Sequence, residues 1–137
     1  MSENKDYFSI EASHNGYEKK FGYIHKRSIK ISKKTDKIFG EDLLEKTKNY
    51  PKPLIYFIRF HIYPDIKITK TKAGNSVLIS LPNREGWLLQ SKTSSFHIEK
   101  NIFLGNKNKI INNESISISG RITAETTSIK WTIEKVN

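Results

Sequence analysis

Apolar and polar side chains alternate along most of this chain, most sharply between residues 56 and 63. One row of this stretch is apolar and consists of Tyr56, Ile58, Phe60 and Ile62. The other row mixes aromatic and basic side chains and consists of Phe57, Arg59, His61 and Tyr63. Because successive side chains of a strand point to opposite faces, the stretch is predicted to be a strand with one buried face. Its aromatic and β-branched content favours the centre of a sheet, and Pro64 is expected to end it.

The same period of two residues predicts further strands before and after this stretch. They are expected at residues 8–12, 23–32, 37–44, 66–68, 77–81, 87–90, 96–102, 116–118 and 129–133. Turn signals separate them, namely Asn15-Gly16, the proline-containing segment 45–53 and the glycine and asparagine of residues 104–108. Gly40 is expected at a bulge or a close approach, and Gly120 is expected to end its strand.

About ten short strands, with turn chemistry between them and no helical period, predict an all-β fold, an antiparallel β-sandwich. No linker-like segment or internal repeat divides the chain, so residues 1–137 are interpreted as one domain. Shared parity within the strands predicts a core that contains Ile58, Phe60, Ile62, Val77, Ile79, Trp131 and Ile133.

The composition is that of a basic protein without thiol chemistry. Lys and Arg number 24 against 14 Asp and Glu, and the formal net charge of +10 favours anionic partners such as nucleic acid, anionic lipid or acidic polysaccharide. The basic residues are scattered, however, and abundant Lys, Ile and Asn are also typical of coding bias. The lack of cysteine excludes disulfides and thiolate-bound metals but leaves the compartment open. The chain has no apolar run of membrane-spanning length, and its start lacks the pattern of a signal peptide.

No catalytic motif is recognisable, and no residue is assigned to catalysis, to a cofactor or to a metal. Glu41 and Asp42 are adjacent, so their carboxylates are expected on opposite faces of a strand, unlike the paired acids of a glycosidase. The histidines match no metal-binding spacing; they are His14, His25, His61 and His97.

Two cationic strand faces remain as candidates for contact with a substrate. They are formed by Arg59 and His61 on one strand and by His25 and Arg27 on another. The planar fork of arginine is well matched to sulfate and carboxylate groups. The alternative is structural: Arg27 and Arg59 tie down neighbouring loops or carboxylates such as Glu41 and Asp42.

Several short segments resemble, in the same order, the C-terminal portion of heparinase II/III family proteins. In this chain they are Ala12-Ser13-His14 with Gly16-Tyr17, Ile24-His25-Lys26-Arg27, Gly40-Glu41-Asp42, Arg59-Phe60-His61 with Pro64-Asp65, and Leu81-Pro82-Asn83 with Gly86-Trp87. The resemblance covers nearly the whole chain, and the ordered motifs make it specific.

The resemblance implies a larger enzyme, with an α/α-toroid before the β-sandwich, that acts as a polysaccharide lyase on acidic, uronate-containing glycans. Such lyases work by β-elimination, in which a base removes the proton beside the uronate carboxylate and a neutralising group stabilises the enolate. The family's toroid and its catalytic and metal-ligand histidines have no counterpart in these 137 residues. The resemblance therefore implies a chain that is inactive alone, with any metal ion held elsewhere in the full enzyme.

The partners expected from this resemblance are an acidic polysaccharide and a separately encoded toroid domain, without membrane or nucleic acid. Family members are often periplasmic or secreted. Two alternatives stay open: a non-catalytic module that binds acidic glycan, and a basic β-domain that binds nucleic acid through aromatics on an exposed sheet face.

Overall fold

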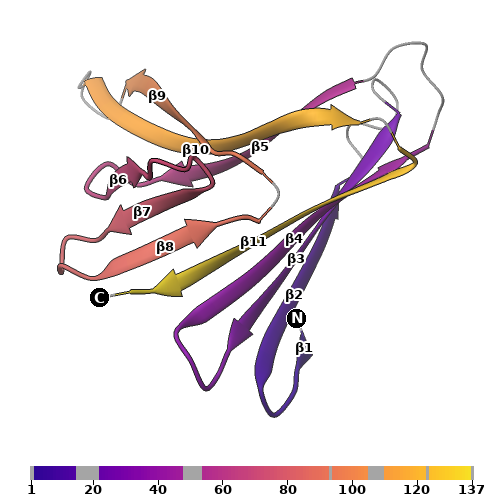
Figure 1. Ribbon diagram of the computed structural model, residues 1–137, viewed down its shortest axis with the longest axis horizontal. Coiled ribbons are helices and arrows are strands. Elements are labelled where there is room, and N and C mark those ends of the chain that lie inside the picture. Colours follow the sequence, from indigo (N-terminus) through magenta and orange to yellow (C-terminus); the bar gives the residue numbers. More distant parts are fainter. Residues whose placement is uncertain are drawn as a thin grey trace.

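The computed structural model describes residues 2–14, 22–47, 54–92, 94–104, 110–122 and 124–136, and within these ranges the protein is built entirely of strands and connections (Figure 1). The strands are β1 (Ser2–Glu3), β2 (Tyr7–His14), β3 (Tyr23–Ser32), β4 (Lys37–Lys46), β5 (Leu54–Ile62), β6 (Lys67–Lys70), β7 (Ser76–Ser80), β8 (Gly86–Gln90), β9 (His97–Leu104), β10 (Ile110–Ile122) and β11 (Thr126–Lys135). No helix capable of crossing a membrane is found in the described ranges.

The strands form two antiparallel sheets. The larger sheet has eight strands in the order β1-β2-β3-β4-β11-β8-β7-β6, and the smaller has three in the order β5-β10-β9. β11 joins the two halves of the larger sheet, because it pairs with β4 along most of its length and with β8 near its end. In Figure 1 the small sheet lies across the top of the larger one. The predicted all-β sandwich is confirmed.

The core lies between the sheets and only part of the predicted core is fully buried. Ile58, Val77 and Trp131 are buried as predicted. The prediction of full burial is wrong for residues that pack against the core but stay partly exposed, which are Phe60, Ile62, Ile79 and Ile133. Three strands are too narrow to cover eight, so inward-facing side chains near the rim of the contact keep some exposure to solvent.

The alternation in β5 is confirmed, but its predicted central position is wrong. Tyr56 and Ile58 point into the core, whereas Ile55 and Phe57 are 61% and 55% exposed. β5 pairs only with β10 and therefore forms an edge of the small sheet; β10 is the central strand. Alternation reports which face of a strand is buried, but it carries no information on how many neighbours the strand has.

Glycine at position 120 does not end its strand, contrary to prediction, because β10 runs from Ile110 to Ile122. Gly120 pairs with Tyr56 of β5, and an added Cβ would lie 2.5 Å from the Tyr56 hydroxyl oxygen. Gly40 makes a close approach, as predicted, to Trp131 of β11. Its register with β3 and β11 is unbroken, so the alternative of a bulge is wrong.

Most other predicted boundaries agree with the structure to within two residues. β4 continues to Lys46, so the start of the predicted loop 45–53 is strand. The rest of that loop from residue 48, the Asn15-Gly16 hairpin and the turn at residues 105–108 lie outside the described residues.

Candidate functional site

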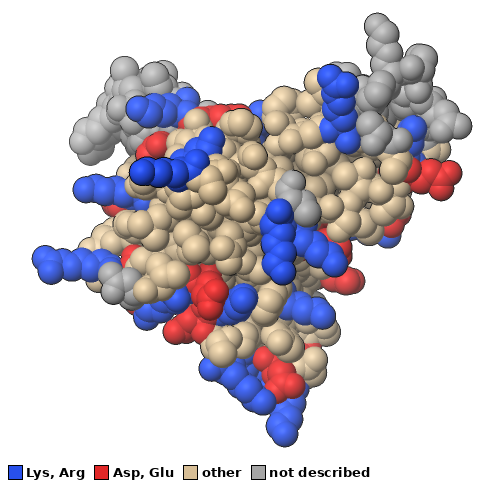
Figure 2. Space-filling model, viewed as in Figure 1, with Lys and Arg blue, Asp and Glu red and all other residues tan. Residues whose placement is uncertain are grey.

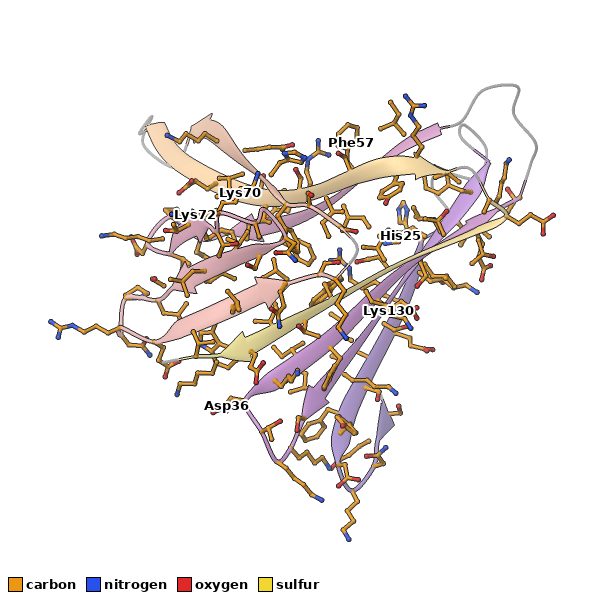
Figure 3. The ribbon with its side chains drawn as sticks, viewed as in Figure 1. His25, Asp36, Phe57, Lys70, Lys72 and Lys130 are labelled. Atoms are coloured by element: carbon orange, nitrogen blue, oxygen red, sulfur yellow. The ribbon has the colours of Figure 1, made fainter. Side chains whose placement is uncertain are left out.

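A groove of about 500 Å³ lies where the two sheets meet, between β2, β3 and β5. It collects side chains from both candidate strand faces, namely His25, Arg27, Arg59 and His61. Tyr23, Leu44, Tyr56 and Ile58 complete part of its wall. Figure 3 shows His25 and Phe57 on opposite sides of the small sheet, so the groove follows the open edge of β5. We call it the inner groove.

Asp42 anchors the inner groove from below. Its side chain is fully buried, and a buried carboxylate is stable only when hydrogen-bonded and neutralised. It contacts His25 Nε2 at 2.6 Å through Oδ1, and it accepts hydrogen bonds from Arg27 Nε at 2.7 Å and from Trp131 Nε1 at 2.8 Å. Arg27 lies directly opposite Asp42 on β3, and Ile129 lies opposite it on β11. His25 and Trp131 are two residues from these positions, so they share the face of the sheet to which Asp42 points.

The ionisation of Asp42 follows from this environment. Burial raises the pKa of the carboxyl, but the hydrogen bonds from His25, Arg27 and Trp131 together outweigh it and hold the pKa below its ordinary value. Asp42 is therefore an anion at neutral pH, and its charge is balanced inside the fold.

Arg27 is committed to this anchor. Besides its bonds to Asp42, its guanidinium lies 5.1 Å from the centre of the Phe60 ring and 6.0 Å from that of Trp131. This is the arrangement that the structural alternative described for Arg27. Glu41 points to the opposite face, as predicted, and accepts a hydrogen bond from the Ser128 hydroxyl.

Arg59 has different surroundings. Its Nε donates to Glu99 Oε2 at 3.2 Å, and its guanidinium lies 5.0 Å from the centre of the Phe57 ring. The hydrogen bond from Arg59 is the main reason why the pKa of Glu99 is lowered. Arg59 therefore also ties down a neighbouring carboxylate, as the structural alternative describes, although its partner is Glu99 and neither Glu41 nor Asp42. Arg59 is 44% exposed in its side chain, and His61 is also exposed.

The groove therefore contains two pairs of basic side chains with different surroundings. The side chains of His25 and Arg27 are 24% and 30% exposed, and both are engaged by Asp42. Arg59 and His61 face solvent. Sequence reasoning missed Asp42 as the residue that organises the groove. The available signal was a lone carboxylate on the same strand face as Leu44, since an inward-facing acid requires cationic partners. Within the described ranges, no three side chains of His, Asp or Glu are grouped as metal ligands.

Comparison with known proteins agrees with this architecture. Residues 2–132 match the family described as heparinase II/III-like, C-terminal. FtsZ-localized protein C of Caulobacter vibrioides is 30% identical over 89 residues, which are 60% of this chain and 15% of that protein.

Two solved structures resemble the fold closely. Heparan sulfate lyase HepC from Pedobacter heparinus superposes with a TM-score of 0.78 at 12% identity, over 99% of this chain and 21% of that one. A heparinase III structure superposes with a TM-score of 0.73 at 13% identity, over 100% of this chain and 21% of that one. This chain thus spans about a fifth or less of the length of these relatives. The ordered motifs, the two-sheet fold and the match over residues 2–132 lead to one conclusion: the chain belongs to the heparinase II/III-like C-terminal family.

Proposed function

We propose that this domain serves as the β-sandwich part of a polysaccharide lyase that acts on acidic, uronate-containing glycans, with the inner groove beside the substrate. The observation that carries the proposal is the convergence of Arg59 and His61 on one exposed wall of a groove whose other wall is held by Asp42. The membership of the family and the likeness to lyase structures support it.

The groove is suited to binding anions rather than to breaking bonds. β-Elimination needs a base at the uronate C5 and a group that neutralises the carboxylate as the enolate forms. His25 is already engaged by Asp42, and Arg27 is shared between that carboxylate and two aromatic rings. Arg59 and His61 are free of the buried anchor and can meet a sulfate or carboxylate group of a glycan. The proton-transferring groups would come from a separate helical domain.

The purified chain is expected to show no turnover on heparin, heparan sulfate or polyuronates, because His25 and Arg27 of the inner groove are engaged by the buried Asp42. Elimination creates an unsaturated uronate, so ultraviolet absorbance follows the product directly. Mixing the chain with a helical toroid domain encoded beside it should produce that absorbance. Sustained turnover by the chain alone would contradict the proposal that the proton-transferring groups lie in a separate helical domain. A mixture of two folded domains that bind each other but remain inactive would contradict the lyase assignment.

Arg59 and Arg27 are expected to respond oppositely to replacement. Arg59→Ala should leave the melting temperature nearly unchanged, because an exposed ion pair contributes only about 0–1 kcal/mol, and should weaken the binding of a heparin decasaccharide about fivefold or more. Arg27→Ala should lower the free energy of unfolding by about 2–4 kcal/mol, because it leaves the buried Asp42 anion short of its partner. Thermal denaturation and titration calorimetry measure the two effects.

Glu99→Gln is the matched control for Arg59. It removes the carboxylate that holds the guanidinium but keeps the hydrogen-bonding shape, so it should preserve or strengthen glycan binding. Unchanged binding by Arg59→Ala, with a lowered melting temperature, would show that Arg59 is structural.

A further inference from the structure

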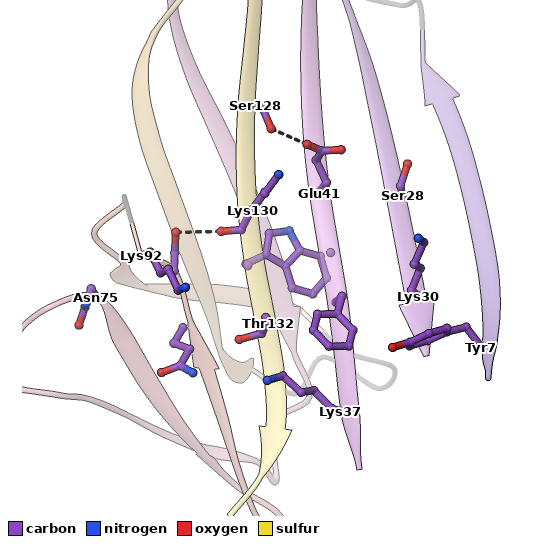
Figure 4. Close-up of a pocket in the computed structure, with 15 residues that line it drawn as sticks. Tyr7, Ser28, Lys30, Lys37, Glu41, Asn75, Lys92, Ser128, Lys130 and Thr132 are labelled. Atoms are coloured by element: carbon purple, nitrogen blue, oxygen red, sulfur yellow. Dashed lines mark hydrogen bonds between the residues drawn. The ribbon is translucent and has the colours of Figure 1, made fainter. Parts of the chain in front are cut away.

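A second and larger hollow lies on the other face of the eight-stranded sheet. It has a volume of about 950 Å³ and is lined by side chains of β3, β4 and β11 together with the segment that follows β8 (Figure 4). Glu41 lines it, whereas the adjacent Asp42 belongs to the inner groove. Since neighbouring side chains of a strand point to opposite faces, the two sites lie on opposite faces of the sheet. We call the second site the outer hollow.

The hollow exists because β8 and β11 separate. Their pairing ends at Gln90 and Thr132, after which the chain leaves towards the small sheet. Ser91 fixes the point of departure, because its hydroxyl donates to the Lys130 carbonyl at 2.9 Å and its backbone N–H donates to the Asn75 carbonyl at 3.1 Å. The hollow is therefore bounded by hydrogen-bonded backbone and is part of the fold.

The lining is strongly basic. It contains four lysines, Lys30, Lys37, Lys92 and Lys130, and a single carboxylate, that of Glu41. Figure 4 shows Lys92 on one side of the hollow, Lys30 on the other and Lys130 between them.

Three of these ammonium groups have no counter-charge among the residues that the structure describes. Lys37 pairs with Glu134 at 3.7 Å. For the exposed Lys30, Lys92 and Lys130, no carboxylate of the described residues lies within ion-pair distance. Like charges around a concavity raise the local potential and attract anions.

We propose that the outer hollow binds a segment of acidic polysaccharide, with sulfate or carboxylate groups on Lys30, Lys92 and Lys130. The choice of acidic polysaccharide as the ligand rests on the proposed function. The site itself is separate from the inner groove and would hold the glycan away from the reacting bond. The remaining lining supplies hydroxyl and amide groups suited to sugar hydroxyls, from Ser28, Asn75, Gln90, Ser128 and Thr132.

The aromatic side chains favour a glycan over single-stranded nucleic acid. Binding of single strands relies on bases stacked on accessible aromatic faces. Phe39 lies beneath the Lys37 ammonium, at 5.1 Å from the ring centre, and meets Tyr7 edge-on at 6.2 Å between centroids. Both rings are thus occupied by neighbours, and the exposed groups of the hollow are ammonium, hydroxyl and amide.

Lys and Arg are spread over the visible face of the molecule (Figure 2), so removing any of them lowers its general attraction for a polyanion. The test therefore compares two triple variants with the same loss of charge. The first is Lys30→Gln, Lys92→Gln, Lys130→Gln in the hollow. The second is Lys67→Gln, Lys70→Gln, Lys72→Gln; these three exposed residues lie around β6 and do not line the hollow.

Binding of a heparin decasaccharide to the whole chain is measured by calorimetry at several salt concentrations. The hollow variant should lose at least tenfold in affinity, and the slope of log affinity against log salt should fall by about 2–3, close to one unit per ammonium contact. The β6 variant should lose no more than about twofold. Thr132→Phe, which keeps every charge but fills the hollow, should also lose about tenfold, with its fold verified by circular dichroism.

Equal losses for the two triple variants, or unchanged binding by Thr132→Phe, would overturn the inference and leave only diffuse attraction by a basic surface. Tighter binding of an oligodeoxynucleotide of equal charge, lost in the same hollow variants, would assign the hollow to nucleic acid instead. Arg59→Ala keeps the two proposals apart: if it weakens binding while the hollow variant does not, the inner groove stands and the outer hollow fails.

Discussion

Replacement of Asp42 by alanine is expected to lower the free energy of unfolding by about 3–5 kcal/mol, the usual cost of breaking a buried ion pair from one side. The side chain is fully buried and engages His25, Arg27 and Trp131. Its loss leaves the Trp131 N–H without an acceptor and the Arg27 guanidinium without its anion. Urea denaturation of the wild-type protein and the variant measures the difference.

Glu41→Ala is the matched control, because Glu41 is the adjacent carboxylate on the opposite face and accepts a hydrogen bond from the exposed Ser128 hydroxyl. It should cost less than about 1 kcal/mol. Similar losses for Asp42→Ala and Glu41→Ala would show that the buried cluster does not organise the fold.

The same residue predicts how stability responds to acid. The folded pKa of Asp42 lies below the ordinary aspartate value of 3.8, so its contribution to stability is present above that value and is lost as the pH falls through the folded pKa. Asp42→Asn cannot titrate there, so its stability should fall less steeply than that of the wild type below about pH 4. Parallel curves would contradict the assignment.

The second large effect is expected at Gly40. An added Cβ would lie 2.1 Å from Cζ2 and 2.2 Å from Cε2 of Trp131, far inside any observed contact. The Trp131 indole cannot easily move, because its N–H is bound to Asp42 and its ring packs edge-on against Phe60 at 5.0 Å. Gly40→Ala should therefore cost about 3 kcal/mol or more, at the upper end of overpacking effects, as measured by thermal or urea denaturation.

A double-mutant cycle separates this clash from the general cost of changing a strand glycine. The atoms in conflict belong to the six-membered ring of the indole. Trp131→Phe replaces the two fused rings by one smaller ring and so removes bulk from the region of the clash. In the Trp131→Phe background, Gly40→Ala should cost at least about 1 kcal/mol less than in the wild type. An unchanged cost would mean that the strain arises from the backbone rather than from Trp131.

The four basic side chains of the inner groove were predictable from the sequence, but which of them are engaged by the buried Asp42 was not. The strand faces bearing Arg59 and His61, and His25 and Arg27, follow from residue spacing, and the structure brings them to one groove. That Arg27 is held by Asp42, whereas Arg59 is held by Glu99, depends on which strands become neighbours. The outer hollow had no signal in the sequence, because its lysines come from β3, β4, β11 and the segment after β8.

The sequence by itself determined the strands, the inward face of each and the all-β class, because alternation is a local property that burial of one face imposes on the chain. The ordered motifs also carried the family resemblance. Only the tertiary structure decided that β5 is an edge strand, that β10 continues through Gly120 and that β11 joins β4 to β8. These features depend on contacts between residues distant in sequence. The pairing of Ile129 and Arg27 with Asp42 is such a contact, and it turns an ordinary aspartate into the buried anion that organises the groove.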